Sequence, residues 1–168
     1  RRFMFIPPNS GLNLNVDGSY INGEMRGGGL VRNPYGSVII CFSAFYGWGL
    51  SLCVEIRAMY IGLTLCERFN ITVEEIESDT TVSVHLLQGK ADPSWDLSYM
   101  VRQCRIKISH GISIKHTWCE GNFAVDNMAC VGRVEEDLLI YSCDGSIPKS
   151  CNHIILSDVL GLDHFRPP

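Results

Sequence analysis

The first part of the chain alternates between apolar and polar residues in short segments. From Leu12 to Asp17 every second residue is apolar, which predicts a half-buried strand that ends at Asp17. A second strand is expected at residues 30–32, after three consecutive glycines, and a third at residues 37–46, after a Pro- and Gly-containing turn at residues 33–36. The short connections between these segments predict an antiparallel meander.

Helical and strand periodicities then follow one another up to residue 133. Apolar residues recur at steps of three and four, so we expect helices over residues 51–70, 80–87, 95–108 and 123–133. We expect two more strands over residues 72–78 and 112–117. Helical crossovers of this length imply parallel neighbours. The sequence therefore predicts an α/β fold with a mixed five-stranded sheet, three antiparallel and then two parallel strands, and helices on both faces.

Length and composition indicate one globular domain. The chain has 168 residues, of which 46% are hydrophobic and 19% charged. No apolar run reaches the roughly 18 residues that a membrane span needs. We interpret residues 1–11 as a leader or linker, residues 12–133 as the domain and residues 134–168 as a C-terminal extension. Because the chain begins with Arg1, we expect it to be part of a longer polypeptide or a processed product.

The eight cysteines indicate a cellular compartment rather than a metal site. No two of them form a Cys-x-x-Cys pair, so a zinc ribbon is not expected. Most fall in apolar strand or helix patterns, where cysteine behaves as a small buried hydrophobe. We therefore expect an intracellular, reducing compartment, either the nucleus or the cytoplasm.

Four carboxylates fall where strands end or helices begin. Asp17 ends the first strand and Asp79 follows the fourth, so their side chains meet if the two strands are parallel neighbours. Glu55 and Asp126 fall in the first turns of the helices that follow the third and the fifth strands. Hard divalent cations prefer oxygen ligands, and two such cations about 3.5–4 Å apart are a known device for cutting phosphodiesters. The pattern favours a site for two cations.

Each carboxylate also has an ordinary interpretation. Asp17 could open a turn, Glu55 could favour a helix N-terminus, Asp79 could cap the next helix and Asp126 could be a solvated helix residue. As a set, four neighbouring carboxylates repel one another unless cations offset the repulsion. The formal net charge of −4 is not the basic balance typical of nucleic-acid-binding domains, but four positive charges on two bound cations would bring it to zero.

The motifs of residues 12–133 resemble, in order and context, those of plant-type ribonuclease H-like domains. Such domains occur in the reverse transcriptases of plant non-LTR retroelements and in proteins derived from them. The segments that carry the resemblance are NVDGS at 15–19, GGGLVRN at 27–33, VEIRA at 54–58, ESD at 77–79, and EGN at 120–122 with DNMA at 126–129. The resemblance implies the ribonuclease H-like fold and a metal-dependent endonuclease that hydrolyses the RNA strand of RNA–DNA hybrids.

The resemblance also implies roles for individual residues. It implies that two Mg²⁺ ions, with Mn²⁺ as an alternative, are bound by Asp17, Glu55, Asp79 and Asp126. His116, six residues before Asn122, falls at the position of the family's auxiliary histidine, which assists proton transfer or product release. The alternative interpretation is a strand-end histidine packed beside Trp118.

Contact with the nucleic acid is implied at the first strand and at the last helix. The residues concerned are Gly18, Ser19, Asn22 and Asn122. Backbone groups near the first three would contact the RNA 2′-hydroxyls, which distinguish RNA from DNA. Asn122 would help to order the corner of the site.

A second interpretation keeps the fold without the chemistry, as a catalytically weak or inactive nucleic-acid-binding module. Asn22-Gly23 stands where the family has Asn-Pro-Gly, Cys119 stands where it has an arginine, and no strongly basic segment is present. These features favour the binding module. The four carboxylates favour the nuclease, because a binding module gains nothing from holding four like charges together.

Overall fold

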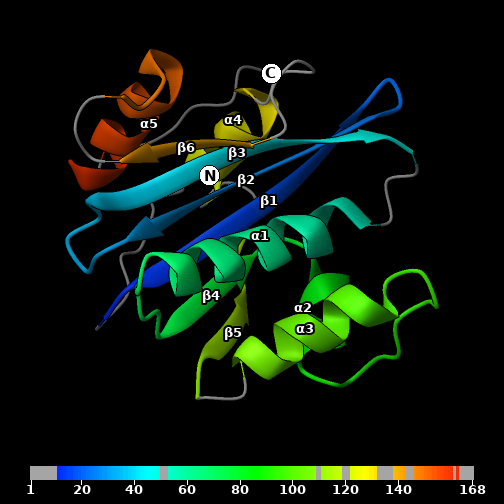
Figure 1. Cartoon of the computed structure of the whole chain (residues 1–168). Helices are drawn as coiled ribbons and strands as arrows, with labels where there is room; N and C mark the ends of the chain where they lie inside the picture. The colour runs from blue at the N-terminus through cyan, green and yellow to red at the C-terminus, as the bar shows by residue number, and fades with distance from the viewer. Residues whose placement is uncertain are drawn as a thin grey trace.

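The computed structural model describes residues 11–49, 53–108, 111–118, 122–131, 138–142, 146–160 and 162. A central sheet crosses the molecule, with helices above and below it (Figure 1). The strands are β1 (Asn13–Ile21), β2 (Glu24–Arg32), β3 (Val38–Trp48), β4 (Glu75–Ser78), β5 (Ser113–His116) and β6 (Leu138–Ser142). The helices are α1 (Val54–Arg68), α2 (Thr81–Leu87), α3 (Ser98–Ile108), α4 (Phe123–Val131) and α5 (Lys149–Val159).

The described strands form one sheet in the order β5-β4-β1-β2-β3-β6. β1, β2 and β3 are antiparallel neighbours, β4 runs parallel to β1, and β5 runs parallel to β4. The predicted mixed sheet, with three antiparallel and two parallel strands, is confirmed. The sheet has one strand more than the five predicted, because β6, from the region interpreted as a C-terminal extension, pairs antiparallel with β3.

The first strand is longer than predicted. The sequence predicted an end at Asp17, but β1 continues to Ile21 and pairs with β2 along its whole length. Asn22 and Gly23 close the hairpin with φ angles of 53° and 87°. These are the left-handed conformations that favoured two-residue turns between antiparallel strands require. The turn therefore lies at Asn22, several residues beyond its predicted position.

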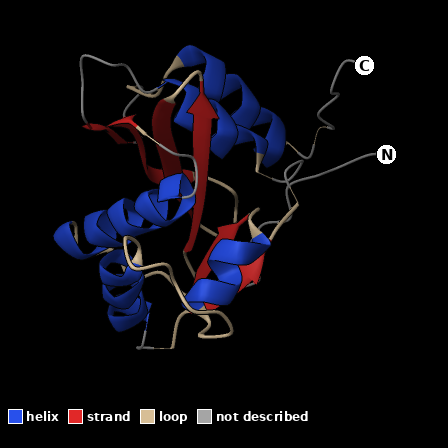
Figure 2. Ribbon diagram, turned by 90° about the vertical axis from the view of Figure 1, so that its right-hand side faces the viewer, coloured by secondary structure: helices blue, strands red, loops and turns tan. Residues whose placement is uncertain are grey.

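Alternation along the strands produces an apolar layer on each face of the sheet. Leu14 and Val16 of β1 and Ile76 of β4 pack with α1 and α3 on one face. On the other face Leu30 of β2 packs with Val125 of α4 and with residues of α5. Figure 2 shows helices on both sides of the sheet, as the sequence predicted.

Gly28 sets the distance between α4 and the sheet. A Cβ atom at this position would lie 2.5 Å from the backbone nitrogen of Ala129, which no side chain could tolerate. Because residue 28 lacks a side chain, α4 packs directly against the backbone of β2. The start of this helix thereby comes close to the middle of β1.

The C-terminal region is joined to the sheet by an ion pair as well as by β6. Arg32, at the end of β2, lies with its Nη1 atom 2.8 Å from Oδ2 of Asp158 in α5, and both side chains are buried. β6 and α5 are therefore packed elements of the described fold. Residues 1–10, most of the predicted leader, lie outside the described part of the chain. Among the helices that are described, none combines the length and the apolar character needed to cross a membrane.

Candidate metal centre

Two of the four predicted carboxylates follow adjacent parallel strands at the same level. The pairing between β1 and β4 ends at Val16 and Ser78, so Asp17 and Asp79 are the next residues along each chain segment. Both line one cavity at the carboxyl end of β4. This is the edge at which open α/β sheets bind ligands.

Glu55 is placed by the start of α1. Its Oε1 atom accepts a hydrogen bond of 3.0 Å from the backbone N–H of Gly18. A Cβ atom at residue 18 would lie 2.6 Å from Cγ2 of Val54 and 2.8 Å from the nitrogen of Glu55. The glycine therefore allows α1 to begin directly against β1, which puts the Glu55 carboxylate beside Asp17.

Asp126 is placed by the start of α4, and Asn122 positions that start. The Nδ2 atom of Asn122 donates to the carbonyl oxygen of Val16 at 3.2 Å. The carbonyl oxygen of Asn122 accepts the amide of Asp126 at 3.0 Å. Asn122 is 1% exposed, so it orders this corner and has no surface for direct contact with a nucleic acid.

The four carboxylates line a single cavity of about 450 Å³. Ligand oxygens of Asp17, Glu55 and Asp79 all lie within 4.8 Å of one another. Hard cations bind oxygens at roughly 2.0–2.6 Å, so oxygens at this separation can share one ion. Asp126 lies on the wall of the same cavity and can contribute to a second ion.

The electrostatics of the cavity favour a cation. Burial raises the pKa of Asp17, and the charges of Asp79 and Asp126 raise it further. Burial also raises the pKa of Glu55, and Asp17 and Asp79 add to this shift. The hydrogen bond from Gly18 acts in the opposite direction in both cases. Repulsion between like charges at short range is the cost that a divalent cation removes.

The donor atoms fit a hard divalent cation. Within the described part of the structure, Oε2 of Glu55 is buried without a hydrogen-bond partner. A cation in the cavity would give this oxygen the partner that it lacks. Carboxylate oxygens are the ligands that Mg²⁺ and Mn²⁺ prefer.

His116 lies at the rim of the carboxylate cluster. Its Nε2 atom is 3.0 Å from the backbone oxygen of Asp79, and its ring makes an edge contact with the ring of Trp118. The structure thus combines the two interpretations of this residue, since the histidine is next to the site and also packs beside the tryptophan. Its part in proton transfer or product release stays a prediction.

The remaining residues predicted to contact nucleic acid lie along β1 and at its hairpin. Gly18 lines the cavity, but its N–H is used by Glu55. Ser19 is half-buried in β1, and Asn22 is exposed in the hairpin turn. Asn22 is five residues along the strand from Asp17, or about 17 Å at the usual rise. Contact there would involve a different nucleotide from the one at the carboxylates.

A polar pair just before the site was missed in the sequence interpretation. Nδ2 of Asn15 donates to Oε2 of Glu77 at 2.6 Å, and the two residues are opposite each other in the parallel pairing. They stand two residues before Asp17 and Asp79, so their bond fixes the register of the two strands that carry the site. Strand alternation was the signal that could have identified them. The missed residues of the cavity wall are Thr80, Thr81 and Val82.

Comparison with known proteins assigns the family. Residues 15–131 match the sequence profile of a family described as reverse transcriptase-like, and the chain belongs to that family. Its fold is the one seen in ribonuclease H domains. The narrower resemblance to the plant branch stays a prediction. A search among curated proteins found no match.

Solved structures show the same fold at low sequence identity. Ribonuclease H1 of the archaeon Halobacterium salinarum has a TM-score of 0.62 and 20% identity, over 71% of this chain and 94% of that one. LC11-RNase H1, isolated from compost and solved with an RNA/DNA hybrid, has a TM-score of 0.65 and 16% identity, over 72% and 95%. The protease-reverse transcriptase of prototype foamy virus has a TM-score of 0.60 and 16% identity, over 75% of this chain and 21% of that one.

Proposed function

We propose that this domain is a divalent-metal-dependent endonuclease that hydrolyses the RNA strand of RNA–DNA hybrids. The observation that supports it is the convergence of four carboxylates on one cavity of a ribonuclease H-like fold. Their close placement, with Asp17 buried, brings like charges together, which is costly for a module that only binds nucleic acid. Perturbed carboxyl groups in a cleft are typical of functional sites.

Two ions, Mg²⁺ or Mn²⁺, would be bound by Asp17, Glu55, Asp79 and Asp126. The chemistry that such ions supply when bound is the activation of a water for in-line attack on phosphorus and stabilisation of the leaving 3′ oxygen. The residues of the chain position these ligands: Gly18 holds Glu55, and Asn122 fixes the start of the helix that carries Asp126.

We propose that His116 exchanges a proton at the rim of the site. Its side chain is exposed, and its Nε2 atom faces the backbone of Asp79 rather than the carboxylates. In this position the imidazole can accept or give a proton at the edge of the cavity without competing for a cation. Recognition of the RNA strand would involve Ser19, farther along β1 from the site, and Asn22, in the turn that follows β1.

We further propose that the domain works in a reducing compartment of the cell. Cys41, Cys66 and Cys104 are free and buried. Burial raises the pKa of the Cys41 thiol to about 12 and that of Cys66 to about 11. These thiols are therefore inert core residues, which agrees with a compartment where disulfides do not form.

The proposed activity is tested by cleavage of an RNA–DNA hybrid with labelled RNA, in magnesium, beside duplex DNA and duplex RNA. We expect cleavage of the hybrid alone, and its loss in Asp79→Asn. Asp96→Asn, the same exchange on an exposed residue outside the cavity, is the matched control and should cleave like the parent. If the folded parent leaves the hybrid intact in magnesium and in manganese but still binds it, the domain is a binding module instead.

A further inference from the structure

Trp118 is a large aromatic side chain in an unusual place. It is 73% exposed, although tryptophan is highly buried on average in folded proteins. It lies two residues after His116, the last residue of β5. Trp48 and Trp95 are also exposed, so what distinguishes Trp118 is its position next to His116 and the candidate active site, where an exposed aromatic face is available to a ligand.

Thr117, next to Trp118, and the side chain of Asn122 are hydrogen-bonded to the two strands that carry the site. The N–H of Thr117 donates to the carbonyl oxygen of Ser78 at 3.0 Å, and Nδ2 of Asn122 donates to that of Val16 at 3.2 Å. Ser78 and Val16 are the residues directly before Asp79 and Asp17. Trp118 therefore lies one residue after a backbone contact with the strand that ends beside Asp79.

The indole is also held from one side. Its ring and the ring of His116 make a T-shaped contact, with centroids 5.6 Å apart and planes at 81°. His116 in turn contacts the backbone of Asp79 at 3.0 Å. These contacts orient the indole and still leave most of its surface open to solvent.

We propose that Trp118 is a stacking platform for an unpaired nucleobase beside the carboxylate site. Aromatic side chains bind the flat faces of bases with little dependence on sequence. Within a continuous duplex those faces are covered by neighbouring base pairs, so the indole can stack on a base only at an end, in a single-stranded stretch or after extrusion. The inference rests on the proposed function and narrows its substrate: the preferred hybrid is one in which paired RNA meets unpaired nucleotides.

The negative net charge of the chain favours base stacking as a source of affinity for the nucleic acid. The formal net charge is −4, with 14 lysines and arginines against 18 acidic residues. Affinity from counterion release is therefore limited, because that contribution grows with the number of lysines and arginines that neutralise phosphates. Base stacking supplies affinity without charge, and it also selects the position of the nucleotide next to the site.

Binding is tested by fluorescence, independently of cleavage. Trp48→Phe and Trp95→Phe together leave Trp118 as the sole tryptophan, and Asp79→Asn in the same chain prevents hydrolysis. We expect the emission of Trp118 to be quenched by a hybrid with a single-stranded RNA overhang and much less by a blunt hybrid of the same length. Equal emission with and without either hybrid, at concentrations that saturate binding by anisotropy, would overturn the proposal.

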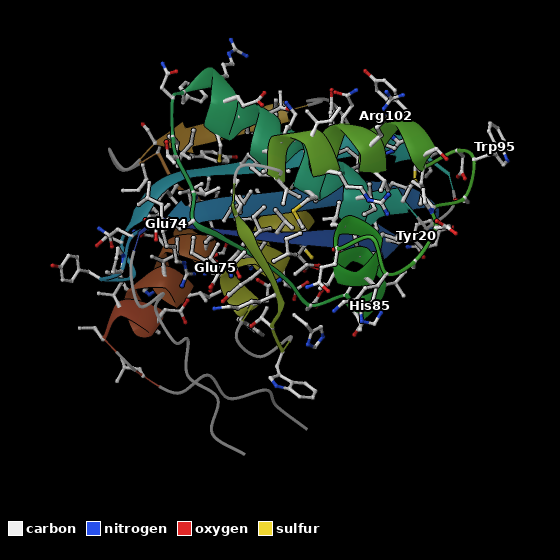
Figure 3. All side chains as sticks on the ribbon, turned by 90° about the horizontal axis from the view of Figure 1, so that it is seen from below. Tyr20, Glu74, Glu75, His85, Trp95 and Arg102 are labelled. Atoms are coloured by element: carbon white, nitrogen blue, oxygen red, sulfur yellow. The ribbon has the colours of Figure 1, made fainter. Side chains whose placement is uncertain are left out.

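Specificity is tested by comparing kcat/KM on the overhang and blunt hybrids. We expect the parent to prefer the overhang hybrid, Trp118→Ala to lower that preference roughly tenfold, and Trp118→Phe to restore most of it. Trp95, 91% exposed on the connection that leads to α3 (Figure 3), provides the matched control, since Trp95→Ala should keep the parental preference. An unchanged preference in Trp118→Ala overturns the proposal. If the parent cleaves neither hybrid, the proposed function fails and the fluorescence result alone decides whether Trp118 stacks.

Discussion

Asp158 and Asp17 are both buried aspartates, but their surroundings are opposite. Asp158 in α5 meets the guanidinium of Arg32 at 2.8 Å, so the fold itself supplies its counter-charge. Asp17 is surrounded by Glu55, Asp79 and Asp126, and its pKa is raised by burial and by like charges. A buried carboxylate that is paired within the protein needs no partner from outside, and removing either member of the pair is strongly destabilising. A carboxylate placed among other carboxylates requires a cation from outside, which marks it as part of a site.

Removing one charge of the Arg32–Asp158 ion pair should have the largest effect on stability. Asp158→Asn leaves Arg32 buried without its counter-charge, which should lower the free energy of unfolding by about 3–5 kcal/mol. Urea denaturation measures the loss. The double variant Arg32→Met/Asp158→Leu is the control, because replacing both charges by apolar groups should restore most of the stability. A loss below about 1 kcal/mol in Asp158→Asn would show that the ion pair does not join α5 to the sheet.

The carboxylates of the cavity should make the metal-free protein less stable as the pH rises. In the metal-free protein the raised pKa values of Asp17 and Glu55 mean that the folded state keeps protons that the unfolded chain has lost. The stability is fully present below the unfolded pKa values and falls as the pH rises above about 5. Thermal unfolding in EDTA measures this fall. Saturating Mg²⁺ should make the stability less dependent on pH, and so should Asp17→Asn. A metal-free protein whose stability stays constant from about pH 5 to pH 8 would contradict this expectation.

A third variant tests how the site is positioned. Asn122→Ala removes the donor to the carbonyl oxygen of Val16, which should cost about 1–3 kcal/mol of stability. Because the start of α4 then shifts, metal affinity should also fall roughly 10- to 100-fold, as for other groups that orient ligands. Asn127→Ala, on the same helix, is the control and should leave metal affinity unchanged. Unchanged affinity in Asn122→Ala would limit its role to the fold.

The smallest expected effect concerns the hairpin turn. Asn22 has a φ angle of 53°, so Asn22→Ala should cost about 1 kcal/mol of stability, whereas Asn22→Gly should fold as well as the parent. If Asn22 also contacts RNA, Asn22→Gly should weaken hybrid binding roughly three- to tenfold. Anisotropy with a labelled hybrid distinguishes the two roles, because a residue that only shapes the turn leaves binding unchanged in the glycine variant.

Much of the fold followed from local patterns, whereas the tertiary details did not. The alternation around Leu14 and the helical spacing after Glu55 predicted the strand, the helix and the side-by-side placement of Asp17 and Asp79. The extension of β1 to Ile21 was missed because the Gly18–Ser19 step is typical of a turn, and only pairing with β2 keeps it extended. β6 was missed because its short apolar run does not indicate a strand by itself. It forms a strand by pairing with β3, which lies far earlier in the chain.

The convergence of the four carboxylates was predicted more completely than the contacts that hold them in place. Asp17, Glu55, Asp79 and Asp126 were identified because their order matched a known set of motifs, and the structure brings them to one cavity. The hydrogen bond between Asn15 and Glu77 was not foreseen, since it depends on the register of two strands that are distant in sequence.

The central claim, that these carboxylates form a cation site, is tested most directly by calorimetric titration of the metal-free protein with Mn²⁺ near neutral pH. We expect saturable binding in the parent and in Asp96→Asn, and its loss or a weakening of at least about tenfold in Asp17→Asn. The same isotherm in Asp17→Asn as in the parent, or no binding in a folded parent, would contradict it.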